Sequence, residues 1–135
     1  MKVLIFGASN SKNSINKTLA TYAGDLLLQA NDTVELDIID LNDFEMPIYS
    51  IDREKESGIP AQAQSFFDKI GQADALIISY AEHNGSYTAA YKNIFDWASR
   101  VDAKVFQDKK MVILATSPGP GGAASIIEKA TNSAP

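Results

Sequence analysis

The sequence predicts an α/β fold in which helices cover both faces of a mostly parallel sheet. Segments with strand patterns alternate along the chain with segments of helical periodicity, and three of the strand segments are apolar almost throughout. Strands joined through helices pair in parallel with right-handed crossovers, and continuous apolar runs are typical of strands buried on both faces. With 135 residues, 45% of them hydrophobic, the chain is expected to form a single domain over residues 1–135.

Each element is predicted from its own pattern. Strands are expected over 2–7, 33–40, 73–80 and 110–116, and helices over 14–30, 60–72, 86–100 and 121–131. The first helix is predicted to turn an apolar stripe inward, formed by Ile15, Leu19, Ala23, Leu26 and Ala30. The stretch 40–59, which contains Pro47 and Gly58, is predicted to be irregular.

The burial patterns also predict the order of the strands. Segment 33–40 alternates apolar and polar residues and is expected at an edge, whereas the other three strands have interior patterns. The order 2-1-3-4 satisfies this and gives a flavodoxin-like three-layer sandwich. In such a sheet, ligands bind beyond the carboxyl ends of the strands, at the switch point between strands one and three.

Composition excludes several classes of function. A net charge of −5 argues against a nucleic-acid partner, and the absence of cysteine excludes disulfides, thiolate metal sites and a thiol nucleophile. No apolar run is long enough to span a membrane, and Met1-Lys2 lead directly into strand sequence without a signal-peptide pattern. We therefore expect a cytoplasmic protein with no membrane partner and no metal site.

The loop "GASNSKNSIN", Gly7 to Asn16, follows the first strand and is rich in small hydrogen-bonding residues. Capping of the first helix by Asn13 or Ser14 explains one or two of these residues. The others, together with the N–H groups of a helix start, indicate a site for a doubly charged anion. The nucleotide motif G-x-G-x-x-G is absent, and so is the second glycine of a P-loop.

Two further loops lie at the same end of the predicted sheet. The segment 81–100 begins with a polar turn, Glu82 to Ser86, before a helix in which Ile94 and Trp97 are ordinary core residues. The segment "TSPGPGGAAS", residues 116–125, contains three glycines, which let the main chain approach a flat ligand closely. An anion in the first loop and a planar body between the other two match the shape of flavin mononucleotide (FMN).

Over its whole length the sequence resembles the NADPH-dependent FMN reductase family of flavodoxin-like proteins, which includes quinone, chromate and azo-dye reductases. Three motifs carry the resemblance, and the second is the most specific. They are a G-S-x-R-x-x-S-x-N-type loop at 8–16, a P-E-Y-N-G-S-x-P-x-x-L-K-N-x-x-D-W segment at 81–97 and an S-P-G-G-x-x-G-type loop at 117–122. The segments "DFEMPIY" and "QADA", at 43–49 and 72–75, also fit the family.

The resemblance implies roles for individual residues. The FMN phosphate is expected at Ser9, Ser11, Ser14, Ile15 and Asn16. The flavin ring is expected along Glu82, His83, Asn84 and Gly85, with Ser117 and Gly119 closing its pyrimidine side. No residue is predicted to act as a catalytic acid or base, because the flavin carries the chemistry.

The sequence departs from the family motifs at four positions. The arginine of the first loop is replaced by Ser11, so Lys12 is expected to neutralise the negative charge of the phosphate. The proline, tyrosine and second proline of the middle motif are replaced by Ala81, His83 and Thr88. The change from tyrosine to His83 removes aromatic area near the ring and bears on flavin affinity and substrate preference.

The resemblance implies an NAD(P)H-dependent enzyme that passes hydride through FMN to a flavin, quinone, azo or metal-ion acceptor. An electron-carrier flavodoxin is an alternative that the acidic charge and short length favour, although the carrier's T-x-T-G-N-T loop is absent. A flavin-free interaction module of the same fold is the third possibility, since motif positions are substituted.

The family resemblance also implies a homodimer or homotetramer. The expected contact surface is an exposed aromatic patch of Tyr87, Tyr91 and Phe95 on the third helix. The usual fifth strand and last helix of the fold have no counterpart before Pro135. Residues 111–115 are therefore expected to form an edge strand despite their interior pattern, either in a truncated chain with a looser flavin site or with a neighbour covering the edge.

Overall fold

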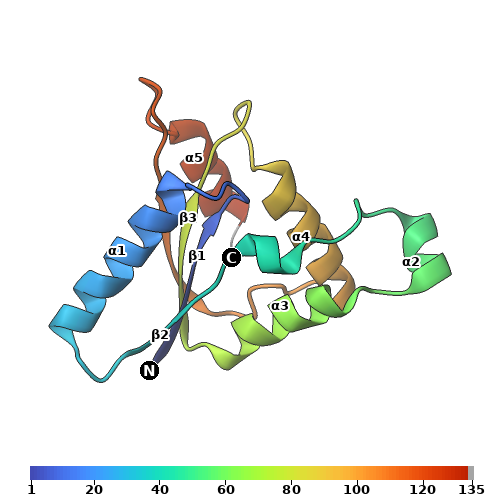
Figure 1. Cartoon of the computed structure of the whole chain (residues 1–135), viewed down its shortest axis with the longest axis horizontal. Helices are drawn as coiled ribbons and strands as arrows, with labels where there is room; N and C mark the ends of the chain where they lie inside the picture. Colours follow the sequence, from blue (N-terminus) through green and yellow to red (C-terminus); the bar gives the residue numbers. More distant parts are fainter. Residues whose placement is uncertain (134–135) are drawn as a thin grey trace.

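The computed structural model describes residues 1–133 and contains one parallel four-stranded sheet in the order β2-β1-β3-β4 (Figure 1). The predicted flavodoxin-like order is confirmed. The elements in chain order are β1 (Lys2–Ala8), α1 (Ile15–Ala30), β2 (Glu35–Ile38), the 3₁₀ helix η1 (Leu41–Phe44), α2 (Ile51–Ser57), α3 (Ala61–Gln72), β3 (Ala75–Tyr80), α4 (Ala89–Val101), β4 (Lys110–Ala115) and α5 (Ala124–Ser133).

Helix α1 packs on one face of the sheet through its small residues. Asn16, Ala20 and Gly24 are its buried positions, whereas Ile15 and Leu26 are exposed. The predicted inward stripe was therefore wrong at Ile15, Leu26 and Ala30, whereas Ala23 of that stripe packs against the core. A Cβ on Gly24 would lie 2.3 Å from Ile5 Cδ1, so small side chains allow the helix to lie close to the strands.

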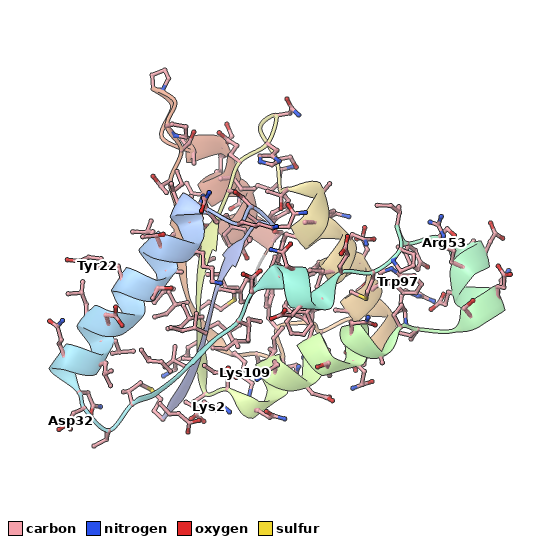
Figure 2. The ribbon with its side chains drawn as sticks, in the orientation of Figure 1. Lys2, Tyr22, Asp32, Arg53, Trp97 and Lys109 are labelled. Carbon is pink, nitrogen blue, oxygen red and sulfur yellow. The ribbon has the colours of Figure 1, made fainter. Side chains whose placement is uncertain are left out.

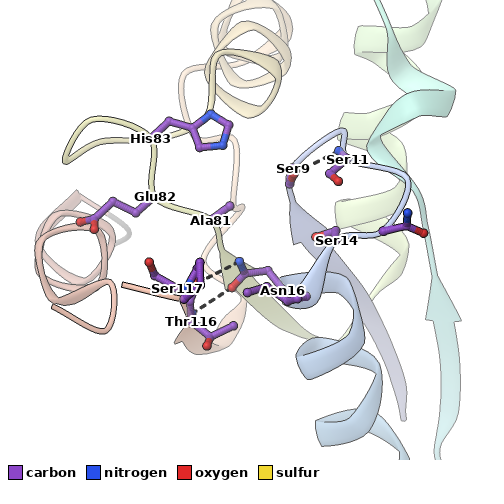
Figure 3. A pocket seen from close by; sticks show the side chains of 12 residues that line it. Ser9, Ser11, Ser14, Asn16, Ala81, Glu82, His83, Thr116 and Ser117 are labelled. Carbon is purple, nitrogen blue, oxygen red and sulfur yellow. Dashed lines mark hydrogen bonds between the residues drawn. The ribbon is translucent and has the colours of Figure 1, made fainter. Parts of the chain in front are cut away.

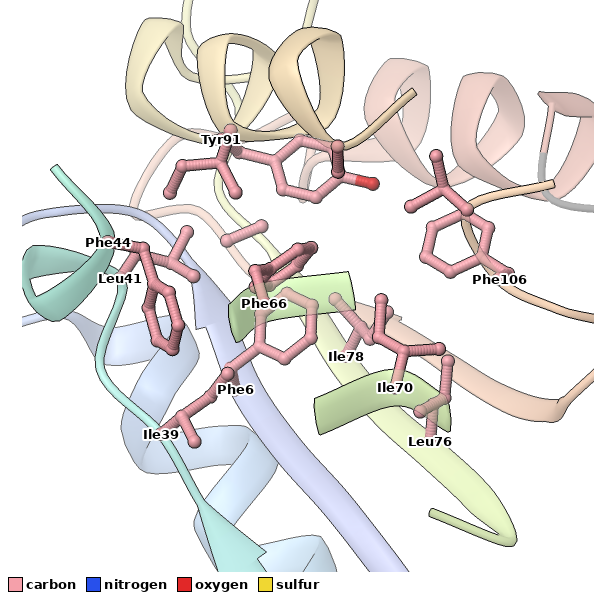
Figure 4. Close-up of a cluster of buried hydrophobic side chains, with 14 of the residues drawn as sticks. Phe6, Ile39, Leu41, Phe44, Phe66, Ile70, Leu76, Ile78, Tyr91 and Phe106 are labelled. Carbon is pink, nitrogen blue, oxygen red and sulfur yellow. The ribbon is translucent and has the colours of Figure 1, made fainter. Parts of the chain in front are cut away.

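The other face carries the larger core, beneath α3, α4 and α5. Its centre is aromatic: Phe66 of α3 packs edge-on against Phe6 and Phe44, with ring centroids 5.7 and 5.5 Å apart (Figure 4). Helices on both faces complete the predicted three-layer sandwich.

The stretch 40–59, predicted to be irregular, contains two short helices. Asp40 caps η1 and Ser50 caps α2, each through its side-chain oxygen. The segment between them is held by α4, because Trp97 Nε1 donates to the carbonyl oxygen of Pro47 at 2.7 Å (Figure 2). Side-chain caps make these turns helical, although the stretch lacks an apolar period.

Strand β4 pairs only with β3 among residues 1–133, so the expected edge position is confirmed. Its expected burial on both faces was wrong, since Val112 is 50% exposed. The predicted aromatic patch on α4 also differs from expectation. Tyr91 is only 2% exposed and, like the partly buried Tyr87 and Phe95, packs with the core rather than standing free in solvent.

Candidate functional site

A pocket of about 200 Å³ opens at the carboxyl ends of β1, β3 and β4 (Figure 3). This is the end of the sheet where the sequence placed its three loops. The lining residues are Ser9, Ser11, Asn13, Ser14, Ile15, Asn16, Ala81, Glu82, His83, Thr116, Ser117 and Pro118.

The first loop, residues 9–14, is shaped by its own hydroxyl groups. Ser9 Oγ accepts the N–H of Ser11 at 3.1 Å, and Ser14 Oγ accepts the N–H of Lys17 at 3.1 Å as the N-cap of α1. Ser9 and Ser14 are buried, whereas Ser11 is exposed. The loop thus presents hydroxyls beside the N-terminus of a 16-residue helix, where the helix dipole favours an anion.

Asn16 lies in the first turn of α1 and connects three elements. Its Oδ1 accepts from Ser79 Oγ at 2.8 Å and from the N–H of Thr116 at 3.0 Å, while its Nδ2 donates to the carbonyl oxygen of Thr116 at 3.1 Å. The side chain is 2% exposed. Its carboxamide is therefore largely engaged inside the protein even though the residue lines the pocket.

The second loop, residues 81–87, ends in a tight turn. His83 and Ser86 exchange main-chain hydrogen bonds of 3.0 and 3.1 Å around Asn84 and Gly85, which have φ angles of 53° and 73°. Positive φ at both central positions is typical of a type I′ turn and explains the Asn-Gly pair. The turn directs its tip away, so Asn84 and Gly85 lie outside the pocket lining while His83 lies in it.

Two side chains of this region hold neighbouring elements. Glu82 Oε1 accepts the N–H of Ile126, in the first turn of α5, at 3.0 Å. Thr88 Oγ1 donates to the carbonyl oxygen of Ala8 at 2.9 Å and accepts the N–H of Tyr91 as the N-cap of α4. These two contacts fix the second loop against α5 and β1.

The third loop, residues 116–123, contributes Thr116, Ser117 and Pro118 to the pocket. Ser117 Oγ accepts the N–H of Gly119 at 3.2 Å, but Gly119 itself lies outside the lining. A Cβ on Gly121 would meet nothing within 4 Å, so the main chain there is open to an approaching molecule.

The two lysines near the first loop, Lys12 and Lys17, differ in their surroundings. Lys17 Nζ lies 2.7 Å from Asp40 Oδ2. This bond, helped by the N–H of Asn42, lowers the pKa of Asp40 from 3.8 to about 2. Lys17 is thus committed to a carboxylate, whereas Lys12 is exposed on the loop but lies outside the pocket lining.

Most residues predicted from the sequence meet in this pocket, apart from Lys12, Asn84, Gly85 and Gly119. Asn13, Ala81, Thr116 and Pro118 also line it, although no part in ligand binding was predicted for them. Each of these residues belongs to one of the segments 7–16, 81–100 and 116–125, and this position in the sequence could have indicated that it lines the pocket. Within residues 1–133, no group of three or more potential metal ligands comes together, and no helix is long and apolar enough to cross a membrane.

Comparison with known proteins identifies the family. The model of the family described as NADPH-dependent FMN reductase matches residues 1–134. The chain belongs to this family. The three motifs that carried the resemblance are the three loops that meet in the pocket.

Family relatives include an NADPH:quinone oxidoreductase of Arabidopsis thaliana, which is 31% identical over 93% of this chain and 62% of its own length. A 2-hydroxy-1,4-benzoquinone reductase of a Burkholderia species is 34% identical over 92% of this chain and 64% of its own length. This chain therefore spans less than two thirds of these relatives.

Solved structures agree with the fold. The flavoenzyme NAD(P)H:(acceptor) oxidoreductase FerB of Paracoccus denitrificans matches 97% of this chain and 69% of its own, with 28% identity and a TM-score of 0.73. An azoreductase of Bacillus anthracis has a TM-score of 0.72 at 18% identity, covering 99% of this chain and 79% of its own. The second likeness shows the shared fold alone.

Proposed function

We propose that this chain forms the FMN site of an NAD(P)H-dependent oxidoreductase that reduces quinone-type acceptors. The observation that carries the proposal is the convergence of three family motifs on one pocket at the carboxyl ends of β1, β3 and β4. The quinone class is supported by the names of the relatives in Arabidopsis thaliana and the Burkholderia species.

The chemistry of the donors fits the phosphate of FMN at the first loop. Ser9 and Ser11 supply hydroxyls, the start of α1 supplies main-chain N–H groups, and Lys12 supplies an exposed positive charge on the same loop. We assign the phosphate to this end, with Ser14, Ile15 and Asn16 forming its floor.

The other two loops fit the flavin ring. His83 and Ser117 both border the pocket, and a Cβ added at Gly121 would meet no atom within 4 Å. We assign Glu82 to Gly85 to one margin of the ring and Ser117 to Gly119 to its pyrimidine side. The imidazole of His83 occupies the place of the tyrosine found in the family motif.

When bound, FMN supplies the redox chemistry by accepting two electrons from NAD(P)H and passing them to the acceptor. The chain itself binds the phosphate, orients the ring and leaves room beside it for the second reactant. This division of work requires no acid–base pair, and none is assigned. His83 lines the pocket, and we assign it to the side where a substrate enters beside the ring.

We also propose a cytoplasmic enzyme that works as a homodimer or homotetramer. The family resemblance supports the assembly. Exposed apolar residues of β4 and α1, rather than Tyr91, offer the surface for it. A chain without cysteine forms no disulfides and so does not depend on an oxidising compartment.

Titration with FMN and riboflavin, followed by the flavin's blue absorption and fluorescence, tests the site. Tighter binding of FMN than of riboflavin supports the phosphate assignment, and equal binding contradicts it. Anaerobic addition of NADH or NADPH should then bleach the bound flavin, and a quinone should restore its colour. A flavin that binds but is never bleached indicates an electron carrier, and a chain that binds no flavin indicates an interaction module.

A further inference from the structure

Side chains from other parts of the site form hydrogen bonds to the start of the third loop, residues 116–123, and to the first turn of α5, which follows it. At its start, Asn16 binds the main-chain N–H and the carbonyl oxygen of Thr116. At its end, Glu82 binds the N–H of Ile126 in the first turn of α5. Between these two points Ala123 is buried in the core, but a Cβ added at Gly121 or Gly122 would meet no atom within 4 Å. The bonds to Asn16 and Glu82 therefore help to hold a segment whose glycines have open space around them.

The hydrogen bond from the N–H of Ile126 to Glu82 caps α5, because the residues just before the helix carry no capping side chain. Gly122 and Ala123, the two residues before α5, have φ angles of 60° and 62°. Alanine carries no side-chain acceptor for the free N–H groups of a helix start. The carboxylate of Glu82, from a loop 44 residues away, supplies that acceptor at 3.0 Å and places negative charge at the positive end of the helix.

The same side chain thereby connects two loops that face one pocket. Glu82 and Ser117 both line the pocket, and Glu82 is followed directly by His83. A shift of α5 relative to the second loop would change the separation between His83 and Ser117. Holding the two loops together before a ligand arrives reduces the ordering cost of binding.

We propose that Glu82 is a positioning residue that sets the width of the ring site by capping α5, rather than a direct ligand of the flavin through its carboxylate. The inference rests on the proposed FMN site. It gives the side chain of Glu82 a role distinct from that of its main chain, which borders the pocket.

The test compares Glu82→Ala with Glu82→Gln and with Ser50→Ala. The glutamine keeps an oxygen acceptor for Ile126, and Ser50→Ala removes a side-chain helix cap from α2, outside the pocket. Glu82→Ala should raise the Kd for FMN and for riboflavin by about tenfold each, the equivalent of one ordinary hydrogen bond. Glu82→Gln should recover most of the affinity, and Ser50→Ala should lower the melting temperature without changing either Kd.

Hydrogen exchange of the flavin-free protein gives a readout that does not depend on the proposed function. Amides of residues 117–126 should exchange faster in Glu82→Ala, but not in Glu82→Gln or Ser50→Ala. Unchanged exchange and unchanged Kd in Glu82→Ala would overturn the inference, as would a glutamine variant as impaired as the alanine variant. Failure of the unmutated protein to bind FMN would overturn the proposed function instead, leaving the exchange result to decide on the cap.

Discussion

Gly7 lies where β1 passes against the first turn of α1, and its missing side chain allows that approach. A Cβ at this position would lie 2.5 Å from the main-chain nitrogen of Lys17 and 2.7 Å from its Cα. Because main-chain atoms cannot rotate away, α1 would have to shift. We expect Gly7→Ala to lower the free energy of unfolding by about 2 kcal/mol or more, measured by urea denaturation.

Gly121→Ala is the matched control, since an added Cβ there meets no atom within 4 Å. It should change the free energy of unfolding by about 0.5 kcal/mol or less. A Gly7→Ala variant as stable as this control would show that α1 tolerates displacement from β1.

Lys12 is the cation assigned to the FMN phosphate in place of the family's arginine. It is exposed, so its attraction for a phosphate is screened by solvent and salt. We expect Lys12→Ala to weaken FMN by about 1 kcal/mol, roughly fivefold in Kd, and to leave riboflavin binding unchanged. The measurement is the Kd of both ligands at low and high salt. The increase in the Kd for FMN caused by Lys12→Ala should be smaller at high salt.

Lys55→Ala serves as the control, because Lys55 is an exposed lysine in the last turn of α2 and does not line the pocket. It should leave the Kd for FMN unchanged. An equal loss for FMN and riboflavin in Lys12→Ala would place the lysine near the ring rather than the phosphate.

Asp40 joins α1 to the end of β2 through its bond to Lys17. The pKa of Asp40 in the folded protein is about 2, below its ordinary value of 3.8, so its ionised form is favoured by folding. The stabilisation is present above pH 3.8 and is lost as the pH falls through about 2. Asp40→Asn should therefore lower the melting temperature at neutral pH, and the difference from the unmutated protein should vanish towards pH 2.

Lys104→Gln is the control for this pH dependence, since Lys104 and Asp108 form an exposed pair whose contribution is small. Its melting curve should follow that of the unmutated protein from neutral pH downwards. Asparagine keeps an oxygen that can cap η1, so a difference for Asp40→Asn that persists at pH 2 would show that the effect does not come from the charge of Asp40.

At the scale of elements, Thr88 joins α4 to the end of β1. Its hydroxyl is buried, caps α4 and donates to the carbonyl oxygen of Ala8. Thr88→Val keeps the shape but loses both bonds, so we expect a loss of about 2 to 4 kcal/mol in the free energy of unfolding. Thr88→Ser keeps the hydroxyl and should lose much less. If urea denaturation finds the two variants equally stable, the hydroxyl does not contribute.

The sequence predicted the strands, the longer helices and the strand order more accurately than it predicted which face of each element is buried. Continuous apolar runs located β1, β3 and β4, and an alternating pattern located β2. The buried face of α1 was missed, since its close packing requires the small residues Ala20 and Gly24 rather than the larger Ile15 and Leu26. Helix η1 and α2 were missed because side-chain caps form them without an apolar period.

The candidate site was predictable as three loops but not as a set of contacts. Motif resemblance placed Ser9, Ser14 and His83 at one pocket, and the structure brings them together. Nothing in the spacing indicated that the carboxylate of Glu82 caps α5 or that Asn16 bonds to Thr116. Those contacts join residues far apart in sequence, and they depend on packing that local patterns do not encode.

At the scale of the whole molecule, the side beside β4 carries the apolar surface best suited to another chain. Val112 is half-exposed on β4, and the exposed residues Ile15, Tyr22 and Leu26 have spacings that place them on one side of α1. Tyr22 is labelled on this helix in Figure 2. Lys17, on the opposite flank of α1, is held at the β2 side by Asp40, which turns the side with Ile15, Tyr22 and Leu26 towards β4. Unpaired main-chain groups of an edge strand beside apolar side chains favour association.

We therefore predict that copies of this chain associate through β4 and the adjoining flank of α1. Light scattering should report a mass that rises with concentration for the unmutated chain, and Val112→Lys should shift it towards the monomer because the charge cannot be buried without a partner. Ile48→Lys is the control, since Ile48 is 66% exposed and precedes α2 on another part of the molecule. A monomer at every concentration would contradict association, and an oligomer equally weakened by both variants would contradict its placement at β4.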